Sequence, residues 1–317
     1  MGRIPVIAID KLESPATLAA IDRACRDWGF FQVVGHGIEP ALLDAHLAEA
    51  RRFFALPDAV KRGVERTAEN AWGYFDRELT KNTRDWKQIF DVGPADGASL
   101  RPQWPSAQPG LRPAVLAHYA ACETLAFRLL GALSRNLGMP GDHLAAGFRP
   151  RHSSFLRLNY YPACPAPERP AGIETTRHGH LGINHHTDAG ALTVLQQDHR
   201  PGLEVYRHGE WHVVEPLPGA LVINIGDIVQ VWSNDRYRAA LHRVTVSESG
   251  DRLSAAFFFN PDYAADYAPL PSTVEAASPA RYRAINWGEF RARRAAGDYA
   301  DLGVEVQIEH YRTQDSP

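Results

Sequence analysis

Residues 191–225 read ALTVLQQDHRPGLEVYRHGEWHVVEPLPGALVINI, in which short apolar runs alternate with turn residues. The runs span 191–196, 203–206, 211–214 and 220–225. Runs of this length that are rich in Val, Leu, Ile and aromatic residues and bounded by Gly, Pro and Asp are typical of antiparallel strands. The tetrapeptide Arg207-His208-Gly209-Glu210 should close a hairpin between two of them.

Strand-like runs continue on both sides of this stretch. They span 155–160, 242–246 and 252–259, so the alternating pattern extends over 154–261. Ser249-Gly250-Asp251 should turn the chain between the last two runs, which would place residue 246 opposite Arg252. Many short strands with regular turns predict an antiparallel sandwich or barrel.

Helical periodicity surrounds the β-rich region. Apolar residues recur at helical spacing over 14–29, 40–55 and 113–138, and again around Trp287 and Phe290, while residues 30–34 form a short strand. The fold class is therefore mainly β with surrounding α. We expect a mixed α/β region over 1–110 and the β core with a C-terminal helical segment over 111–317. No linker-like composition separates them, so they should form one structural unit.

Composition and charge narrow the classes of function. The 317 residues are 44% apolar and 22% charged, and the net charge of -3 gives no electrostatic footprint for nucleic acid or an anionic membrane. The expected partner is a small molecule. Cys25, Cys122 and Cys164 are scattered and indicate free thiols, and neither a basic leader nor a long apolar run occurs, so we expect a cytoplasmic protein. Both a monomer and a homodimer fit the sequence.

His186-Thr187-Asp188 places an imidazole and a carboxylate two residues apart. In a strand, positions i and i+2 share one face, so both side chains can reach one ion while Thr187 faces away. His242, at the start of a predicted strand, is the expected third ligand. Two histidines and one carboxylate on one face of an octahedral metal leave three positions open, as in non-heme Fe(II) oxygenases, whereas zinc usually prefers a closed tetrahedral set.

Other histidines compete for this assignment. His178 and His180 lie in a Gly/Pro-containing loop and are expected to be exposed or to belong to a lid. His185 has Thr187 rather than a carboxylate at i+2 and is expected to support the site without binding the metal. A lone His-x-Asp is common by chance, so the assignment depends on the residues that accompany it.

Arg252 and Ser254 form a second pair at positions i and i+2. A guanidinium and a hydroxyl aimed from one strand face suit a carboxylate. With the predicted hairpin, Arg252 would lie roughly 13 Å along the barrel from His242, which leaves room for a five-carbon diacid. The alternative is an ion pair of Arg252 with Asp251 or Glu248 at the strand end.

Asn159 and Tyr161 form a third pair of this kind, offering an amide and a phenol to the same cavity. A buried tyrosine at a sheet edge is the alternative interpretation. Three polar pairs and one downstream histidine that converge on one predicted barrel favour a single functional site.

Short sequence motifs between residues 4 and 254 carry a resemblance to a known family. They are IPVI at 4–7, GFFQV at 29–33, GHG at 35–37, LRLNYYPACP at 156–165, HTD at 186–188, GD at 226–227, LHR at 241–243 and RLS at 252–254. This set resembles the 2-oxoglutarate/Fe(II)-dependent dioxygenase family. Within the family, the chain is most similar to the branch that contains isopenicillin N synthase and the plant flavonoid, gibberellin and ethylene-forming oxygenases. The resemblance covers most of residues 4–265.

The resemblance implies a double-stranded β-helix, or jelly roll, with flanking helices. It assigns Fe(II) to His186, Asp188 and His242, and the far carboxylate of the cosubstrate 2-oxoglutarate to Asn159, Tyr161, Arg252 and Ser254. Such enzymes use O2 to convert 2-oxoglutarate to succinate and CO2 while a small metabolite is hydroxylated, desaturated, demethylated or cyclised.

Alternatives remain at the level of the sequence. Isopenicillin N synthase uses the same Arg-x-Ser pair for a peptide substrate, and 1-aminocyclopropane-1-carboxylate oxidase also works without 2-oxoglutarate, so an iron oxidase of this type is the first alternative. A non-catalytic β-barrel that binds a ligand is the second. Zinc hydrolysis is weaker, because no His-Glu-x-x-His helix is present. The presence of Asp188 disfavours a halogenase.

Arg157 and Phe258 fall where relatives place a cation and an aromatic ring near the substrate. If both line the pocket, an aromatic or acidic small substrate is favoured; a structural Arg157 and a core Phe258 are the alternatives. Residues 166–181 depart from the plant pattern as an enlarged loop, which is expected to cover the mouth of the active site.

Overall fold

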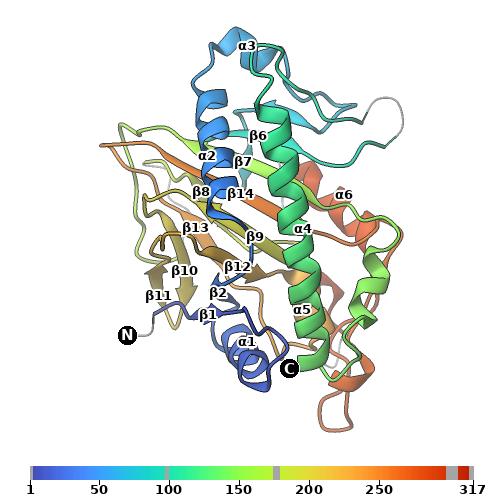
Figure 1. Cartoon of the computed structure of the whole chain (residues 1–317). Coiled ribbons are helices and arrows are strands. Elements are labelled where there is room, and N and C mark those ends of the chain that lie inside the picture. The colour runs from blue at the N-terminus through green and yellow to red at the C-terminus, as the bar shows by residue number, and fades with distance from the viewer. Residues whose placement is uncertain (1–2, 97–99, 174–178, 298–305, 314–317) are drawn as a thin grey trace.

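Two β-sheets form the centre of the molecule (Figure 1). The computed structural model describes residues 3–96, 100–173, 179–297 and 306–313. Within these residues, the major sheet has eight strands in the order β1-β2-β12-β9-β14-β7-β6-β3, and the minor sheet has four in the order β11-β10-β13-β8. Side chains of both sheets, such as Tyr161 and Val244, pack in one buried apolar cluster. The sheets therefore face each other as the two halves of a jelly roll.

The strands are short, as the sequence predicts. The major sheet contains β1 (Val6–Ala8), β2 (Phe30–Val34), β3 (Gly73–Phe75), β6 (Gln88–Val92), β7 (Phe155–Tyr161), β9 (Leu192–Gln197), β12 (Leu221–Ile225) and β14 (Arg252–Phe259). The minor sheet contains β8 (Ile183–His186), β10 (Leu203–Arg207), β11 (Glu210–Val213) and β13 (His242–Val244). Two short pairs lie outside them: β4 (Leu79–Thr80) with β5 (Thr83–Arg84), and β15 (Asp266–Tyr267) with β16 (Ile285–Asn286).

Every run predicted between residues 155 and 259 forms a strand, which confirms the mainly β fold class. Among the strands of the two sheets, sequence reasoning missed β1, β3, β6 and β8. β1 has only three residues, and β3, β6 and β8 carry polar or glycine residues where an apolar alternation would be expected. Four strands from the first 110 residues, β1, β2, β3 and β6, belong to the major sheet. The N-terminal region thus continues the sheet of the β core.

The two predicted hairpins have different outcomes. β10 and β11 are joined at Arg207↔Glu210, and His208 and Gly209 both have positive φ, 50° and 87°, as a two-residue hairpin turn requires. The hairpin predicted at 249–251 is wrong. β13 pairs with β10 and β8, while β14 lies between β9 and β7 in the other sheet, so residue 246 does not face Arg252. Both edges of the buried β14 are occupied by major-sheet strands, and residues 247–251 therefore cross between sheets.

Helices lie outside the sheets. They are α1 (Pro15–Asp27), α2 (Pro40–Phe54), α3 (Asp58–Arg62), α4 (Leu111–Asn136), α5 (Asp227–Trp232) and α6 (Trp287–Gly297), with 3-10 turns η1 (His143–Phe148), η2 (Pro271–Thr273) and η3 (Ile308–Tyr311). Ser14 caps α1 by accepting a hydrogen bond from the Thr17 N–H at 3.2 Å. Among the described residues, no helix is long and apolar enough to cross a membrane.

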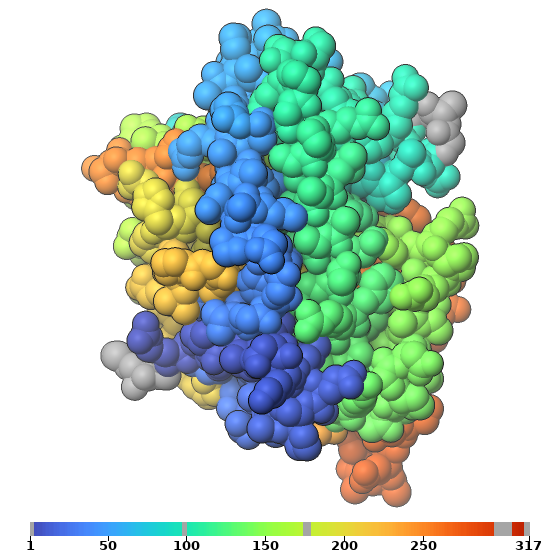
Figure 2. All heavy atoms as spheres, in the orientation of Figure 1, coloured from blue at the N-terminus to red at the C-terminus, as the bar shows by residue number. Residues whose placement is uncertain are grey.

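Helices α2 and α4 run side by side over the outer face of the major sheet, as Figure 2 shows in blue and green. Their apolar residues recur every three or four positions, so each helix turns one face towards the sheet. Leu43 and Phe53 of α2 and Leu129 of α4 are at most 5% exposed and belong to the main core cluster. This layer supports the outer face of β9 and β14, and leaves their inner face for the cavity between the sheets.

The enlarged loop is only partly described, because residues 174–178, with His178, lie outside the described residues. Its described part lies against the minor sheet: Arg243 donates a hydrogen bond to the Pro170 carbonyl at 2.7 Å, and Trp211 donates one to the Gly172 carbonyl at 3.0 Å. The His180 ring lies 4.6 Å from the Trp86 ring. That the loop over residues 166–181 acts as a lid stays a prediction.

Candidate active site

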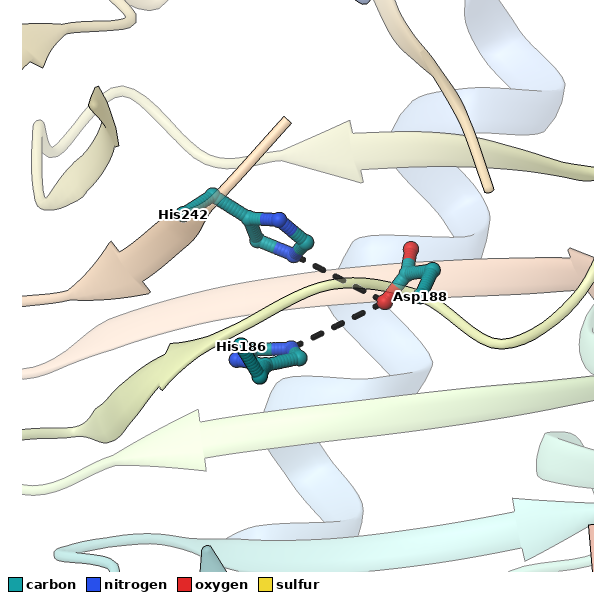
Figure 3. A group of neighbouring side chains, drawn as sticks. All are labelled: His186, Asp188 and His242. Carbon is teal, nitrogen blue, oxygen red and sulfur yellow. Dashed lines mark ion pairs between the residues drawn. The ribbon is translucent and has the colours of Figure 1, made fainter. Parts of the chain in front are cut away.

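The three predicted metal ligands lie close together, two on strands of the minor sheet and one just beyond a strand end (Figure 3). His186 is the last residue of β8 and His242 the first of β13, and the two are cross-strand partners. Asp188 Oδ1 lies 3.7 Å from Nε2 of His186 and 3.6 Å from Nε2 of His242. The strand argument was wrong in one detail, since Asp188 lies beyond the end of β8, in a turn that brings its carboxylate to the same point.

Both imidazoles are oriented by the backbone next to them. His186 Nδ1 lies 2.8 Å from the Asn184 carbonyl oxygen, and His242 Nδ1 lies 3.0 Å from the Ala240 carbonyl oxygen. Because a carbonyl only accepts, each Nδ1 carries the proton, and each Nε2 keeps its lone pair. The two lone pairs point towards Asp188 Oδ1.

The carboxylate of Asp188 is held through its other oxygen. Oδ2 accepts hydrogen bonds from the Thr193 hydroxyl on β9 and from the Asn224 amide on β12, the latter at 2.8 Å. Oδ1 is therefore left for an ion, and outer partners of this kind orient metal ligands in proteins.

Protonation also suits metal binding. Burial and the neighbouring His242 together lower the pKa of His186 to about 3 against the opposing charge of Asp188, so this imidazole is neutral at neutral pH. Burial raises the pKa of Asp188, but His242, His186 and the bonds from Thr193 and Asn224 outweigh this, and the net pKa lies below its usual value. The site thus presents the neutral imidazole of His186 and the ionised carboxylate of Asp188 beside the Nε2 of His242.

The donor set fits a divalent metal. Nitrogen and oxygen ligands that lie about 2.0–2.2 Å from one ion are at most about 4.4 Å apart, and the two separations of 3.6 and 3.7 Å fall within this limit. Within the described ranges, no other group of three or more His, Cys, Asp or Glu side chains converges in this way. His185, which is 7% exposed, bonds through Nδ1 to the Asn184 side chain and lies outside the group.

The residues predicted to bind a carboxylate face the same cavity from the major sheet. In the ladder between β14 and β7, Arg252 lies opposite Tyr161 and Ser254 opposite Asn159. All four are buried and line the cavity together with the three metal ligands. Tyr161 and Ser254 share a hydrogen bond, and burial raises the pKa of the Tyr161 phenol, so it stays protonated and able to donate.

The cavity itself has a volume of about 160 Å³ and is lined on one side by aromatic rings. Phe258 of β14 stacks on Phe155 of β7 with ring centres 4.8 Å apart, and both rings line the cavity. A second cavity of about 480 Å³ shares Phe155, Arg157 and Arg291 as walls with the first. The structure therefore places both predicted substrate residues, Arg157 and Phe258, at the cavity.

A buried group of charges forms another wall, and sequence reasoning missed most of it. Lys87 lies 2.7 Å from Glu78 and 2.9 Å from Asp85, while Arg157 donates to Glu78 and to Asp91, each at 2.8 Å. Burial opposes ionisation of Glu78, but Arg157 and Lys87 hold its pKa well below the usual value. No motif marks these residues, because they come from separate short strands and turns.

Helix α6 provides the remaining wall. Trp287, Arg291 and Arg294 line the cavity from positions i, i+4 and i+7 of this helix. That spacing puts all three on one helix face. The sequence contained this signal, but it could not show which face of the helix would meet the barrel.

Comparisons with known proteins agree with this geometry. Residues 152–261 match the family model described as the 2OG-Fe(II) oxygenase superfamily, and residues 4–110 match the non-haem dioxygenase in morphine synthesis N-terminal model. The oxoglutarate-dependent flavonoid 7-O-demethylase 1 of Ocimum basilicum is 33% identical over 298 residues, which cover 92% of this chain and 77% of that protein. The chain belongs to the 2OG-Fe(II) oxygenase superfamily. This oxygenase is therefore an enzyme that uses Fe(II), 2-oxoglutarate and O2.

Other relatives of the oxygenase span much of its length. Flavanone 3-dioxygenase 2 of rice is 34% identical, with 91% of this chain and 82% of that protein covered. The solved structure of JOX2 in complex with 2OG, Fe and JA has a TM-score of 0.80 and 32% identity, and covers 92% of this chain and 84% of that one. A full-length Neurospora crassa protein, solved in complex with alpha-KG and thymine, has a TM-score of 0.80 at 26% identity, covering 93% and 97%.

Proposed function

We propose that the oxygenase oxidises a small metabolite in the cavity between its two sheets, with 2-oxoglutarate held between the metal ligands and Arg252. The observation that carries this proposal is that the buried Arg252 guanidinium lacks a counter-charge among the described residues. Arg252 is 4% exposed, faces the cavity, and has no carboxylate partner among the described residues. A buried charge without a counter-ion is costly, so an anionic ligand in the cavity would complete the site.

The alternative of an ion pair at the strand end is disfavoured. Asp251 is engaged by Arg51, whose Nη1 lies 3.1 and 3.0 Å from its two oxygens, and by the Tyr160 hydroxyl at 3.1 Å. Arg252 donates instead to the Gln197 side-chain oxygen at 3.0 Å and to the Arg200 carbonyl at 3.3 Å. These neutral acceptors orient the guanidinium without neutralising it.

Each residue of the site has a role in this proposal. The iron ligands are His186, Asp188 and His242, and the residues for the far carboxylate are Arg252 and Ser254, supported by Tyr161 and Asn159. Iron, when bound, supplies the chemistry that joins O2 and 2-oxoglutarate with release of succinate and CO2. The chain contributes orientation, a counter-charge and a cavity between the two sheets, and no side chain has to act as a general acid or base.

For the substrate, we propose a small molecule with a planar apolar or aromatic part. The stacked pair of Phe258 and Phe155 offers a ring surface at the cavity. Arg157 is 14% exposed at its side chain, and its Nε and both terminal nitrogens donate to carboxylates. We therefore propose that Arg157 contributes a polar edge to the pocket and is held in place by Asp91 and Glu78.

Charge and cysteine content bear on the compartment and the partners of the enzyme. A net charge of -3 argues against nucleic acid and membrane partners. Cys25, Cys122 and Cys164 are free and buried, which suits the reducing cytoplasm. We propose a cytoplasmic enzyme of small-molecule, secondary metabolism that acts as a monomer or homodimer, with residues 1–110 and 111–317 working as one unit.

Anaerobic titration of the metal-free protein with Fe(II) and then 2-oxoglutarate tests the proposal. A weak visible charge-transfer band should appear as 2-oxoglutarate binds the iron. Arg252→Ala should lower the affinity for 2-oxoglutarate by about 30-fold or more, because truncating one partner of a buried charge pair costs at least about 2 kcal/mol. Arg112→Ala, which removes an exposed arginine at the start of α4, is the matched control and should leave the affinity unchanged.

The opposite result would favour a different enzyme of the same fold. 1-Aminocyclopropane-1-carboxylate oxidase 5 of Arabidopsis thaliana is 33% identical over 306 residues. If iron binds but no band forms with 2-oxoglutarate, and succinate does not accumulate with product, an iron oxidase that works without 2-oxoglutarate becomes the better assignment.

A further inference from the structure

The turn that carries Asp188 needs support from outside its own sheet. β8 ends at His186, so Thr187 and Asp188 lie beyond the hydrogen-bond ladder that β8 shares with β13. Loops of this kind move unless other groups bind their backbone. The position of the Asp188 carboxylate relative to the two histidines therefore depends on contacts from other elements.

Asp227, the first residue of α5, makes the first of these contacts. Its N–H donates to the Asp188 carbonyl at 2.8 Å, and its carboxylate accepts a hydrogen bond from the Thr187 side chain. The approach is close: a Cβ on Gly226 would lie 2.7 Å from the Asp188 carbonyl oxygen and 2.2 Å from that of Gly190. Asp227 is 1% exposed, so these bonds are not shared with bulk water.

Arg294, on the inner face of α6, makes the second contact. Its Nη2 donates to the Thr187 carbonyl at 3.1 Å, and its Nη1 donates to Asp227 Oδ2 at 3.3 Å and to Gln307 Oε1 at 2.9 Å. One planar guanidinium thus binds two groups. The first is the carbonyl of Thr187, which lies between the metal ligands His186 and Asp188, and the second is the Asp227 carboxylate that braces Thr187. A planar guanidinium, with five donors in a rigid fork, suits such divided contacts in fixed geometry.

From these contacts we propose that Arg294 and Asp227 are positioning residues for the metal. They clamp the 186–188 turn to α6, the helix that also lines the substrate cavity through Trp287 and Arg291. Metal affinity is then a property of the docked C-terminal helix as well as of the three ligands. The inference rests on the metal site and not on the identity of the cosubstrate or substrate.

Co(II) binding to the metal-free protein provides a readout that does not depend on turnover, because the ion gives visible absorption bands that report its coordination. Arg294→Gln should weaken Co(II) binding by about 10-fold or more, which is the size of loss typical when residues outside the ligand set that position a metal site are removed. The bands should also change shape, since the backbone that carries Asp188 is no longer fixed relative to the two histidines. Arg294→Lys keeps the charge but cannot divide its bonds in the same way, and should recover only part of the affinity.

The matched control is Arg293→Gln. Arg293 is the neighbouring, exposed arginine of the same helix, so the variant removes the same charge without touching the turn. Its Co(II) affinity should equal that of the wild type. Thermal unfolding of each metal-free variant separates loss of the fold from loss of the site.

Two outcomes decide the proposal. A folded Arg294→Gln variant that binds Co(II) within twofold of the wild type, even with a lower melting temperature, would show a purely structural brace and overturn it. If Arg294→Gln does not fold, Asp227→Asn takes its place: weaker binding with altered bands supports the clamp, and unchanged binding refutes it. A wild-type protein that binds Co(II) but not 2-oxoglutarate would contradict the proposed function and leave this inference standing.

Discussion

Arg252 of β14 lies directly opposite Tyr161 of β7, with its guanidinium carbon 5.3 Å from the centre of the tyrosine ring. Ser254 and Asn159 oppose each other two positions along the same ladder. Two sequence motifs about ninety residues apart are therefore the two sides of one cross-strand group. The tyrosine ring packs beside the cation, and its hydroxyl bonds to Ser254.

Tyr161→Phe should weaken 2-oxoglutarate binding by about twofold to tenfold, because it removes one hydrogen bond worth about 0.5–1.5 kcal/mol and keeps the ring. Titration of the Fe(II)-loaded protein under anaerobic conditions measures the effect. Co(II) affinity serves as the internal control, since Tyr161 lies on β7 of the major sheet and is not one of the three metal ligands. A loss as large as that of Arg252→Ala would contradict a supporting role for the phenol.

Phe258→Ala should raise KM for the substrate while the affinity for 2-oxoglutarate stays unchanged, because the stacked ring lines the cavity away from Arg252. The measurement is succinate release stimulated by a panel of small aromatic and aliphatic acids. Arg157→Ala should also raise KM if Arg157 borders the substrate. An unchanged KM for the best acid of the panel in either variant would remove that residue from the pocket.

Lys87→Met should destabilise the protein by about 3–5 kcal/mol, because it leaves Glu78 and Asp85 buried without their shared ammonium. Urea unfolding followed by tryptophan fluorescence gives the free energy. Arg62→Ala is the control: its partner Asp76 lies 2.7 Å away, but the arginine side chain is 40% exposed, and exposed pairs contribute less than about 1 kcal/mol. Equal losses of unfolding free energy in both variants would mean that water stabilises the Glu78 and Asp85 carboxylates when Lys87 is removed.

His46 of α2 and His118 of α4 stack 3.8 Å apart within 5° of parallel, and both are fully buried. Burial lowers the pKa of His46 to about 4 against the opposing bond from Gln196, and burial together with His46 lowers that of His118 well below 6.5. Below about pH 6.5 these two histidines bind more protons in the unfolded state than in the folded state. The free energy that their burial contributes to stability is therefore fully present above this pH and is lost as pH falls towards 4.

The loss should reach about 1.4 kcal/mol per pH unit for each histidine. Unfolding free energies of the metal-free protein at pH 7.0 and at lower pH measure it. His46→Gln should flatten the profile, whereas His199→Gln, which changes an exposed histidine, should not. Parallel profiles for the wild type and His46→Gln would show that the stacked pair does not control acid sensitivity.

Local sequence patterns predict much of the architecture. The runs over 191–225 and 252–259 form strands because alternating apolar residues and turn residues act over a few positions. The hairpin at His208 and Gly209 follows from the local backbone conformation. The spacing of positions i and i+2 predicted the pair Arg252 and Ser254 on β14 and the pair Asn159 and Tyr161 on β7, since strand geometry puts such positions on one face. The metal ligands needed more than spacing, because His242 was proposed from its place at the start of a strand and Asp188 lies beyond the end of β8.

Only the tertiary structure decided which elements face the site. β13 and β14 are neighbours in the chain but enter different sheets, and Asp188 reaches the ion from a turn held by Asp227 and Arg294. Asp251 could have neutralised Arg252, but Arg51 of α2, two hundred residues away in the sequence, binds it instead. Such pairings are set by the docking of distant elements and by competition for buried counter-charges, which local periodicity does not encode.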